Sequence, residues 1–180
     1  MSRLFLFLTI FCLAETASAK SINSSILKNS TVLASTIPID KLRYTETVDC
    51  GSVAQADIFR RARLYLLQSA PEDKLLLNDK DTGDLVSGGN LSVMLPRTES
   101  FAGGIYTVQY VLTIECVNRK YRASISRIEV LQISMMKSTP LELFKLQSEK
   151  DTKQLQSEIE AKLKARLEDL KISVTEFKPF

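Results

Sequence analysis

Apolar and polar residues alternate along residues 106–116, which is the most regular pattern in the chain. Every second residue from Tyr106 to Cys116 is apolar, and the residues between them are mainly polar. A period of two with one polar side is typical of an antiparallel strand that is covered on a single face. The uncovered face would carry the candidate binding surface, formed by Thr107, Gln109, Thr113 and Glu115.

Shorter strand patterns precede this one. An alternating stretch at 44–50 ends before a glycine, and the apolar residues 75–77 are separated from a strand that resumes at Leu85 by the turn-forming residues 79–83. The pair Gly88–Gly89 lies inside that strand pattern, which favours a bulge or a close backbone approach over a phosphate loop.

The chain after the regular strand predicts a second long strand. Asn118 and Arg119 form the turn, and inward positions follow until Ile125. The inward set then shifts by one residue, which predicts a β-bulge near Arg127. Upstream, the pair at 103–104 is typical of a hairpin connection.

The segment that begins with Ser52 and Gln55, spaced as in a capping box, predicts an amphipathic helix that ends before Pro71. Its buried stripe is Ile58, Phe59, Ala62, Tyr65, Leu66 and Ser69. Three arginines, at positions 60, 61 and 63, lie beside or opposite this stripe. They lie beyond the first turn, whereas a phosphate site would use the backbone donors of a helix N-terminus. We therefore expect them to keep the outer face of a half-buried helix soluble.

Two helical patterns close the chain. Thr139 and Pro140 predict a helix start, with the threonine as cap and the proline at the first helical position. Beyond Ser148 a longer helix has one apolar stripe, formed by Leu155, Ile159, Leu163, Leu167 and Leu170. Its exposed sides offer three i,i+4 ion pairs: Glu149–Lys153, Glu158–Lys162 and Glu160–Lys164. We expect this helix to pack on the protein's own sheet.

These elements together predict the fold class and the domain organisation. The fold class is α+β, with two layers: a mainly antiparallel sheet of about five strands, and helices on one face of it. The expected order along the chain is a signal peptide at 1–19, a flexible leader at 20–43, the core domain at 44–133 and a C-terminal helical segment at 134–180 that packs on the core.

The first residues predict export. Arg3 is followed by an apolar run from Leu4 to Ala14, and Ala17 and Ala19 occupy the small positions that a signal peptidase reads. This is the layout of a secretory signal peptide with cleavage after Ala19. We expect a periplasmic or secreted protein with no transmembrane segment in the mature chain, because no later segment is apolar enough to span a bilayer.

Composition and charge narrow the chemistry. The chain has 24 basic and 21 acidic residues and a net charge of +3, which is too small to indicate a nucleic-acid partner. Histidine is absent, and with it the commonest general base and metal ligand. The acidic turn at 79–83 has Lys80 and Thr82 where calcium ligands should alternate. We therefore predict no catalytic residues, no metal and no cofactor.

Three stretches of the chain are similar to a known family: IFRRARLYLLQS, DKDTGDLVSGG and YTVQYVLTIECVNRKYRASISRIEV. Across residues 45–130 the chain resembles family 4468, a bacterial family of exported domains of unknown function with a TATA-binding-protein-like fold. The family usually has glycine where Arg119 stands. The resemblance implies the fold but offers no catalytic residues to carry over, and fold alone does not set function.

Signal cleavage leaves two cysteines, Cys50 and Cys116. An oxidising compartment favours a disulfide between them, whereas the alternative is two small buried side chains. In a sheet of the resembled kind the first strand pairs with the last, so the strand of Cys116 lies one position further away. Two strand spacings are about 9–10 Å, beyond the usual Cα–Cα reach of roughly 4.4–6.8 Å. We therefore expect free thiols rather than a disulfide.

Two functions remain open. The first is a non-enzymatic, exported module that binds a partner protein or an envelope ligand through the uncovered sheet face. The second is a cell-envelope hydrolase, which without histidine would need a Ser–Lys pair or two facing carboxylates. No spacing in the sequence singles out such a pair, so we expect the binding module.

Overall fold

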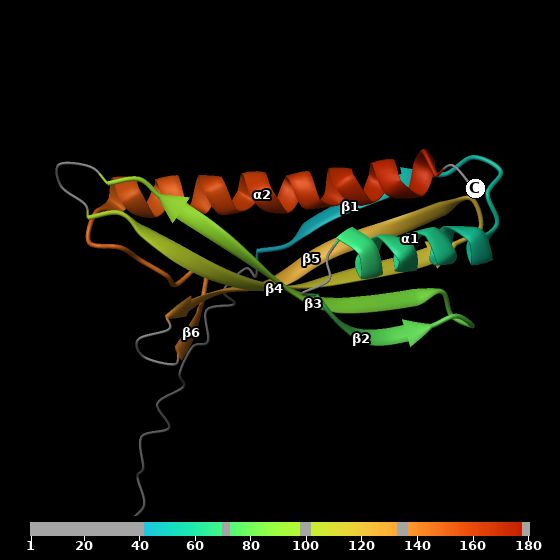
Figure 1. Cartoon of the computed structure of the whole chain (residues 1–180), viewed down its shortest axis with the longest axis horizontal. Coiled ribbons are helices and arrows are strands. Elements are labelled where there is room, and N and C mark those ends of the chain that lie inside the picture. The colour runs from blue at the N-terminus through green and yellow to red at the C-terminus, as the bar shows by residue number, and fades with distance from the viewer. Residues whose placement is uncertain (1–41, 70–72, 98–101, 133–136, 178–180) are drawn as a thin grey trace, which may run out of the picture. The chain divides into compact units, whose positions relative to one another are not determined.

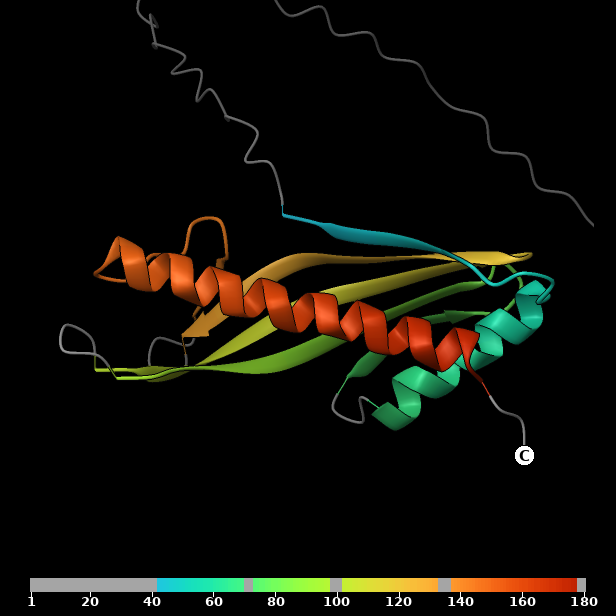
Figure 2. The ribbon, with the colours of Figure 1, turned by 90° about the horizontal axis from the view of Figure 1, so that it is seen from above.

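The sheet and its helices form two layers, with both helices on the same face of the sheet (Figures 1 and 2). The computed structural model describes residues 42–69, 73–97, 102–132 and 137–177, so the predicted signal peptide and nearly all of the predicted leader lie outside the described residues. The elements, in chain order, are β1 (Tyr44–Asp49), α1 (Gln55–Ser69), β2 (Lys74–Asp79), β3 (Asp84–Leu95), β4 (Gly104–Val117), β5 (Lys120–Gln132), β6 (Lys137–Pro140) and α2 (Glu149–Thr175).

The strand order is β1-β5-β4-β3-β2, and every neighbouring pair is antiparallel. β1 pairs with residues 120–125 of β5, and β6 pairs with residues 129–132 along the same edge. The predicted α+β architecture is confirmed, and so is the pairing of the first strand with the last long one. The short strand β6 adds a sixth strand that the sequence did not predict.

The alternation of β4 and β5 places apolar side chains under the helices. Val108, Leu112 and Ile114 are fully buried and Tyr110 is buried with them, while Gln109, Val111 and Thr113 are partly or fully exposed. The predicted bulge is confirmed: the β4–β5 register shifts between Gln109 and Val111, opposite Arg127, whose φ is +52°. The bulge restores the inward phase from Ile128 onward, so both halves of β5 contribute to one core.

α1 covers one end of the sheet, and its predicted stripe is buried where its side chains are described. Its start differs from the predicted capping box. The backbone N–H of Gln55 donates to Asn118 Oδ1 at 3.0 Å, and its side-chain amide donates to the carbonyl of Thr82 at 3.0 Å. The side chain of Gln55 therefore reaches the β2–β3 turn instead of Ser52, because the turns at this end of the sheet offer partners close to the helix start.

α2 runs along the sheet for 27 residues, and its C-terminal part lies beside α1 (Figure 2). It begins after Ser148, whose hydroxyl accepts from the backbone N–H of Asp151. The predicted apolar stripe is buried, and two of the three predicted ion pairs form: Glu149–Lys153 and Glu160–Lys164.

The predicted helix start at Thr139 is wrong. Lys137–Pro140 is the strand β6, and a turn at 141–143 separates it from α2. β1 leaves the second half of one edge of β5 unpaired, and the edge position of Pro140 tolerates its missing N–H. The buried residues Leu141 and Phe144 then follow, with the ring of Phe144 edge-on to Tyr106.

A buried ionic cluster joins α2 to the sheet and to α1. Arg166 of α2 donates from Nη2 to Asp73 Oδ2 at 3.0 Å, and the side chain of Asp73 is only 4% exposed. The hydroxyl of Tyr110 donates to the same carboxylate oxygen at 3.3 Å. Tyr65 of α1 donates its hydroxyl to the carbonyl of Arg166, and the guanidinium lies 5.1 Å from the centre of the Tyr65 ring. Burial raises the pKa of Tyr65 to about 12, so its hydroxyl stays a donor.

Gly89 is what lets this cluster approach β3. A Cβ at position 89 would lie 2.5 Å from the Tyr110 hydroxyl and 2.7 Å from a carboxylate oxygen of Asp73. A Cβ at Gly88 would meet only the end of Leu76, at 3.5 Å. The sequence predicted a bulge or a close backbone approach at the glycine pair, whereas the close neighbours are side chains, and they lie at the second glycine.

We predict that Gly89→Ala lowers the free energy of unfolding by about 1–3 kcal/mol, because overpacking must displace Tyr110 or Asp73. The matched variant Gly88→Ala should change it by no more than about 0.5 kcal/mol. Chemical denaturation of both variants measures the difference. Equal stability of the two variants would contradict the role given to Gly89.

Candidate functional site

The sheet face without helices contains a polar hollow of about 440 Å³. β1, β5 and β4 supply its lining, from two rows of paired residues across the sheet: Thr45, Ser124 and Thr113 in one row, and Arg122 and Glu115 in the next. Because successive side chains of a strand point to opposite faces, residues in these rows lie on the face away from the helices. The residues that line the hollow are Arg43, Thr45, Thr113, Glu115, Arg122, Ser124 and Ser126.

An ion pair with two hydrogen bonds forms the wall of this hollow. Arg122 donates from Nε to Glu115 Oε2 at 2.7 Å and from Nη2 to Oε1 at 2.8 Å. These hydrogen bonds, helped by the charges of Arg122 and Arg43, lower the pKa of Glu115. The carboxylate is therefore a fixed acceptor and a poor proton shuttle at neutral pH.

Hydroxyl groups and one additional cation complete the lining. Thr45 Oγ1 and Ser124 Oγ lie 3.1 Å apart, within hydrogen-bond distance. The exposed Arg43 makes no hydrogen bond or ion pair with any described residue, although its charge acts on Glu115. The hollow thus offers donors and acceptors together with a positive charge that has no bonded counterion in the described part of the chain.

A second, smaller hollow continues this surface toward the β4–β5 turn. It measures about 240 Å³ and shares Glu115 and Arg122 with the first. Its other lining residues are Thr47, Val117, Lys120 and Tyr121. The ion pair therefore lies at the centre of one continuous polar surface, which we name the open-face site.

The predicted binding residues divide into two groups. Thr113 and Glu115 line the open-face site. Thr107 and Gln109 lie on the same face but further along β4, where they pair with Leu131 and Glu129 of β5. The structure therefore brings together only two of the four residues named from the sequence.

The contributions of β1 and β5 were missed. Thr45, Arg122 and Ser124 occupy outward positions of alternating strands, so the same period of two could have indicated them once the strand order was known. Arg43 precedes the regular part of β1 and has no such signal.

The two cysteines lie under the helical layer. Both are free thiols, Cys116 is buried and Cys50 is partly buried. β5 separates their strands, as the resemblance implied. Burial raises the pKa of the Cys116 thiol to about 12, which makes it a weak nucleophile at neutral pH.

The described residues do not include a cluster of metal-ligating side chains. Among the described residues, no three or more Cys, Asp or Glu side chains are grouped as metal ligands.

Neither of the two described helices is both long and apolar enough to cross a membrane.

The architecture is that of a TATA-binding-protein-like α+β domain. The chain is similar to the crystal structure of a DUF4468 family protein from Bacteroides ovatus, with a TM-score of 0.65, 11% identity and coverage of 77% of this chain and 90% of that one. It is also similar to the structure of a TBP-like protein from Parabacteroides distasonis, with a TM-score of 0.64, 15% identity and coverage of 74% and 92%. At these identities the likeness shows the fold alone.

The sequence also matches a family. Residues 44–130 match the family described as a domain of unknown function (DUF4468) with TBP-like fold. The resemblance noted in the sequence is thereby confirmed. Among curated proteins, no match to the chain was found.

We predict that Arg122→Gln raises the pKa of Glu115 toward its ordinary value of 4.5. Because the pKa of Glu115 is lowered in the folded protein, the ion pair stabilises the fold fully at pH values above the ordinary pKa. This stabilisation is lost as the pH falls through the lowered pKa of the folded protein. Arg43→Gln should raise the same pKa by less, because its charge is the weaker cause. NMR titration of the Glu115 carboxyl carbon gives the pKa of this group in the unaltered protein and in both variants. An unchanged pKa in Arg122→Gln would contradict the assignment of Arg122 as the main cause of the lowered pKa.

Proposed function

We propose that this protein is a non-enzymatic binding module of the bacterial cell envelope and that the open-face site carries its ligand. The observation that carries the proposal is the polar hollow around the Arg122–Glu115 pair on the face that α1 and α2 leave uncovered. The opposite face buries the core, so the uncovered face is the part of the sheet that is accessible to a partner.

The lining favours a ligand with a negative group beside hydrogen-bonding groups of both kinds. Arg43 supplies the positive charge, while Thr45, Thr113 and Ser124 can each donate and accept. The lining contains no flat aromatic ring apart from Tyr121, whose side chain is buried in the core. Stacking therefore contributes little, and a polar segment of a partner protein or envelope component fits best.

The same lining supports binding over hydrolysis. A hydrolase would need a nucleophile beside a base, or two facing carboxylates. The hydroxyl of Ser124 faces another hydroxyl, and the neighbouring cations are guanidinium groups, which cannot be deprotonated in proteins. The carboxylate of Glu115 forms an ion pair with Arg122, so within the described part of the chain it does not face a second carboxylate as a hydrolase would require.

Export is the second part of the proposal. It is supported by the sequence of residues 1–19, with its basic start, apolar run and small residues before Lys20. An exported binding module would meet its ligand in the periplasm or outside the cell.

We predict that protein recovered from the host begins at Lys20. Intact-mass measurement of the exported protein tests this directly, since cleavage after Ala19 removes a segment of known mass. A chain that still begins at Met1, or one found only in the cytoplasm, would contradict the export part and leave the proposed site untouched.

We predict that native mass spectrometry of protein purified gently from its host detects a bound species, and that Thr113→Arg removes it. The arginine side chain would fill the hollow and block access to its hydroxyl groups, so affinity should fall roughly tenfold or more, which corresponds to about 1.4 kcal/mol. The matched control is Ser157→Arg, which adds the same side chain at an exposed position of α2.

The two variants separate site binding from other causes. Loss of the species in Thr113→Arg alone supports the open-face site. Loss in both variants, or retention in both, places the ligand elsewhere and overturns the proposed site. Thermal unfolding of both variants confirms that each is folded before the comparison is made.

A further inference from the structure

The outer face of α1 carries a second surface, separate from the open-face site. Of its three arginines, Arg61 is engaged: Nη1 donates to the carbonyl of Val174 at 2.9 Å, and its guanidinium lies 5.2 Å from the centre of the Phe177 ring. Arg61 therefore holds the end of α2 against α1. Arg60 and Arg63 are exposed, as the sequence predicted for the soluble face of this helix.

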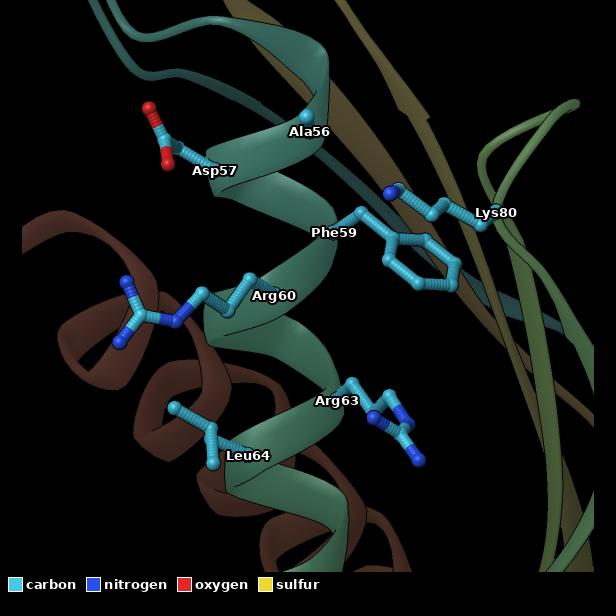
Figure 3. Close-up of a pocket in the computed structure, with 7 residues that line it drawn as sticks. All are labelled: Ala56, Asp57, Phe59, Arg60, Arg63, Leu64 and Lys80. Carbon is cyan, nitrogen blue, oxygen red and sulfur yellow. The ribbon is translucent and has the colours of Figure 1, made fainter.

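A hollow of about 490 Å³ lies beside these two arginines (Figure 3). Arg63 and Lys80 lie at one border of the exposed face of α1, with the ring of Phe59 between them, and Arg60 and Leu64 lie at the other border. Lys80 comes from the turn between β2 and β3, so two separate elements bring their cations to one surface.

The charges on this surface are unbalanced. The lining of the hollow includes three cations, Arg60, Arg63 and Lys80, and one carboxylate, that of Asp57. Arg63 and Lys80 make no ion pair or hydrogen bond with any described residue, and Arg60 contacts only the Phe177 ring, at 5.8 Å. An anionic ligand would therefore gain attraction without displacing an internal ion pair.

Apolar side chains continue the surface along the helix. Arg60, Arg63, Leu64 and Leu67 have the spacing i, i+3, i+4 and i+7, which places them on one face of α1. Leu67 is 52% exposed although it is a large apolar residue. This face therefore presents cations on the first half of α1 and leucines on the second.

We propose that this face of α1 binds an acidic amphipathic segment of a partner protein. The carboxylates of the segment would contact Arg60, Arg63 and Lys80, and its apolar side chains would cover Leu64 and Leu67. An amphipathic helix docks on such a face through apolar anchors at helical spacing, and its carboxylates would reach the cations beside them. The hollow favours a protein over an anionic lipid surface, because a concave site accepts an inserted side chain, and two leucines offer little area to a membrane.

The test uses a synthetic peptide in which Glu and Leu alternate at helical spacing, carrying a fluorescent label, with a Gln-for-Glu version as the neutral probe. Fluorescence anisotropy measures binding to the full chain. We expect the acidic peptide to bind and Arg60→Glu with Arg63→Glu to weaken it at least tenfold, while the neutral peptide binds poorly to both. Leu67→Ser should weaken the acidic peptide less than the charge reversal does.

The matched control is Lys150→Glu with Lys153→Glu, which reverses two exposed cations at the same i,i+3 spacing on α2. Its binding should equal that of the unaltered protein. If the double reversal on α1 fails to fold, Arg63→Gln with Lys80→Gln makes the same comparison with a smaller change.

Three outcomes would overturn the proposal: no binding of the acidic peptide, an equal loss in the α2 control, or no loss in either α1 variant. Binding to vesicles of phosphatidylcholine with phosphatidylglycerol distinguishes an anionic membrane from an acidic protein segment as the partner of this face. Binding to these vesicles that depends on Arg60 and Arg63, without peptide binding, would assign the face to a membrane instead. None of these outcomes bears on the open-face site, which Thr113→Arg tests separately.

Discussion

The ion pair between Asp73 and Arg166 ties the long helix α2 to α1 and to the sheet. It joins the segment before β2 to the middle of α2, and Tyr110 brings β4 into the same cluster. Both charges are largely removed from water, and a buried charge without its partner is costly, so the pair holds only if all the elements arrive together. The absence of a side chain at Gly89 and the hydroxyl of Tyr65 complete the cluster. The long helix is thereby fixed over the sheet, and the other face is left to solvent.

The sequence predicted the parts of this fold that depend on local periodicity. The alternation around Val108 and the helical stripe around Leu163 each indicate which side of an element is buried. Burial of apolar surface is the dominant favourable contribution to the free energy of folding. The bulge near Arg127 was visible as a change of phase. β6 was not, because four residues are too few for a period, and its Thr-Pro sequence also suits a helix start.

The candidate site was predicted only in part for a related reason. Alternation along one strand identifies the outward side chains, but it does not say which strands lie next to each other. Thr113 and Glu115 became part of a site only because β5 places Ser124 and Arg122 beside them. The long-range pair Asp73–Arg166 is equally invisible, since 93 positions separate its partners and neither residue stands out in its own segment.

β2 contains a β-bulge, which has a consequence for how the protein behaves at high concentration. β2 forms one outer edge of the sheet, and its pairing with β3 shifts between Leu75 and Leu77. A regular edge strand with exposed leucines is a template onto which another chain can add a strand, and aggregation follows. The bulge interrupts the row of free backbone groups in the middle, and Lys74 places a charge at its start. The sheet can therefore display apolar side chains at this edge and still be a poor seed for intermolecular β-structure.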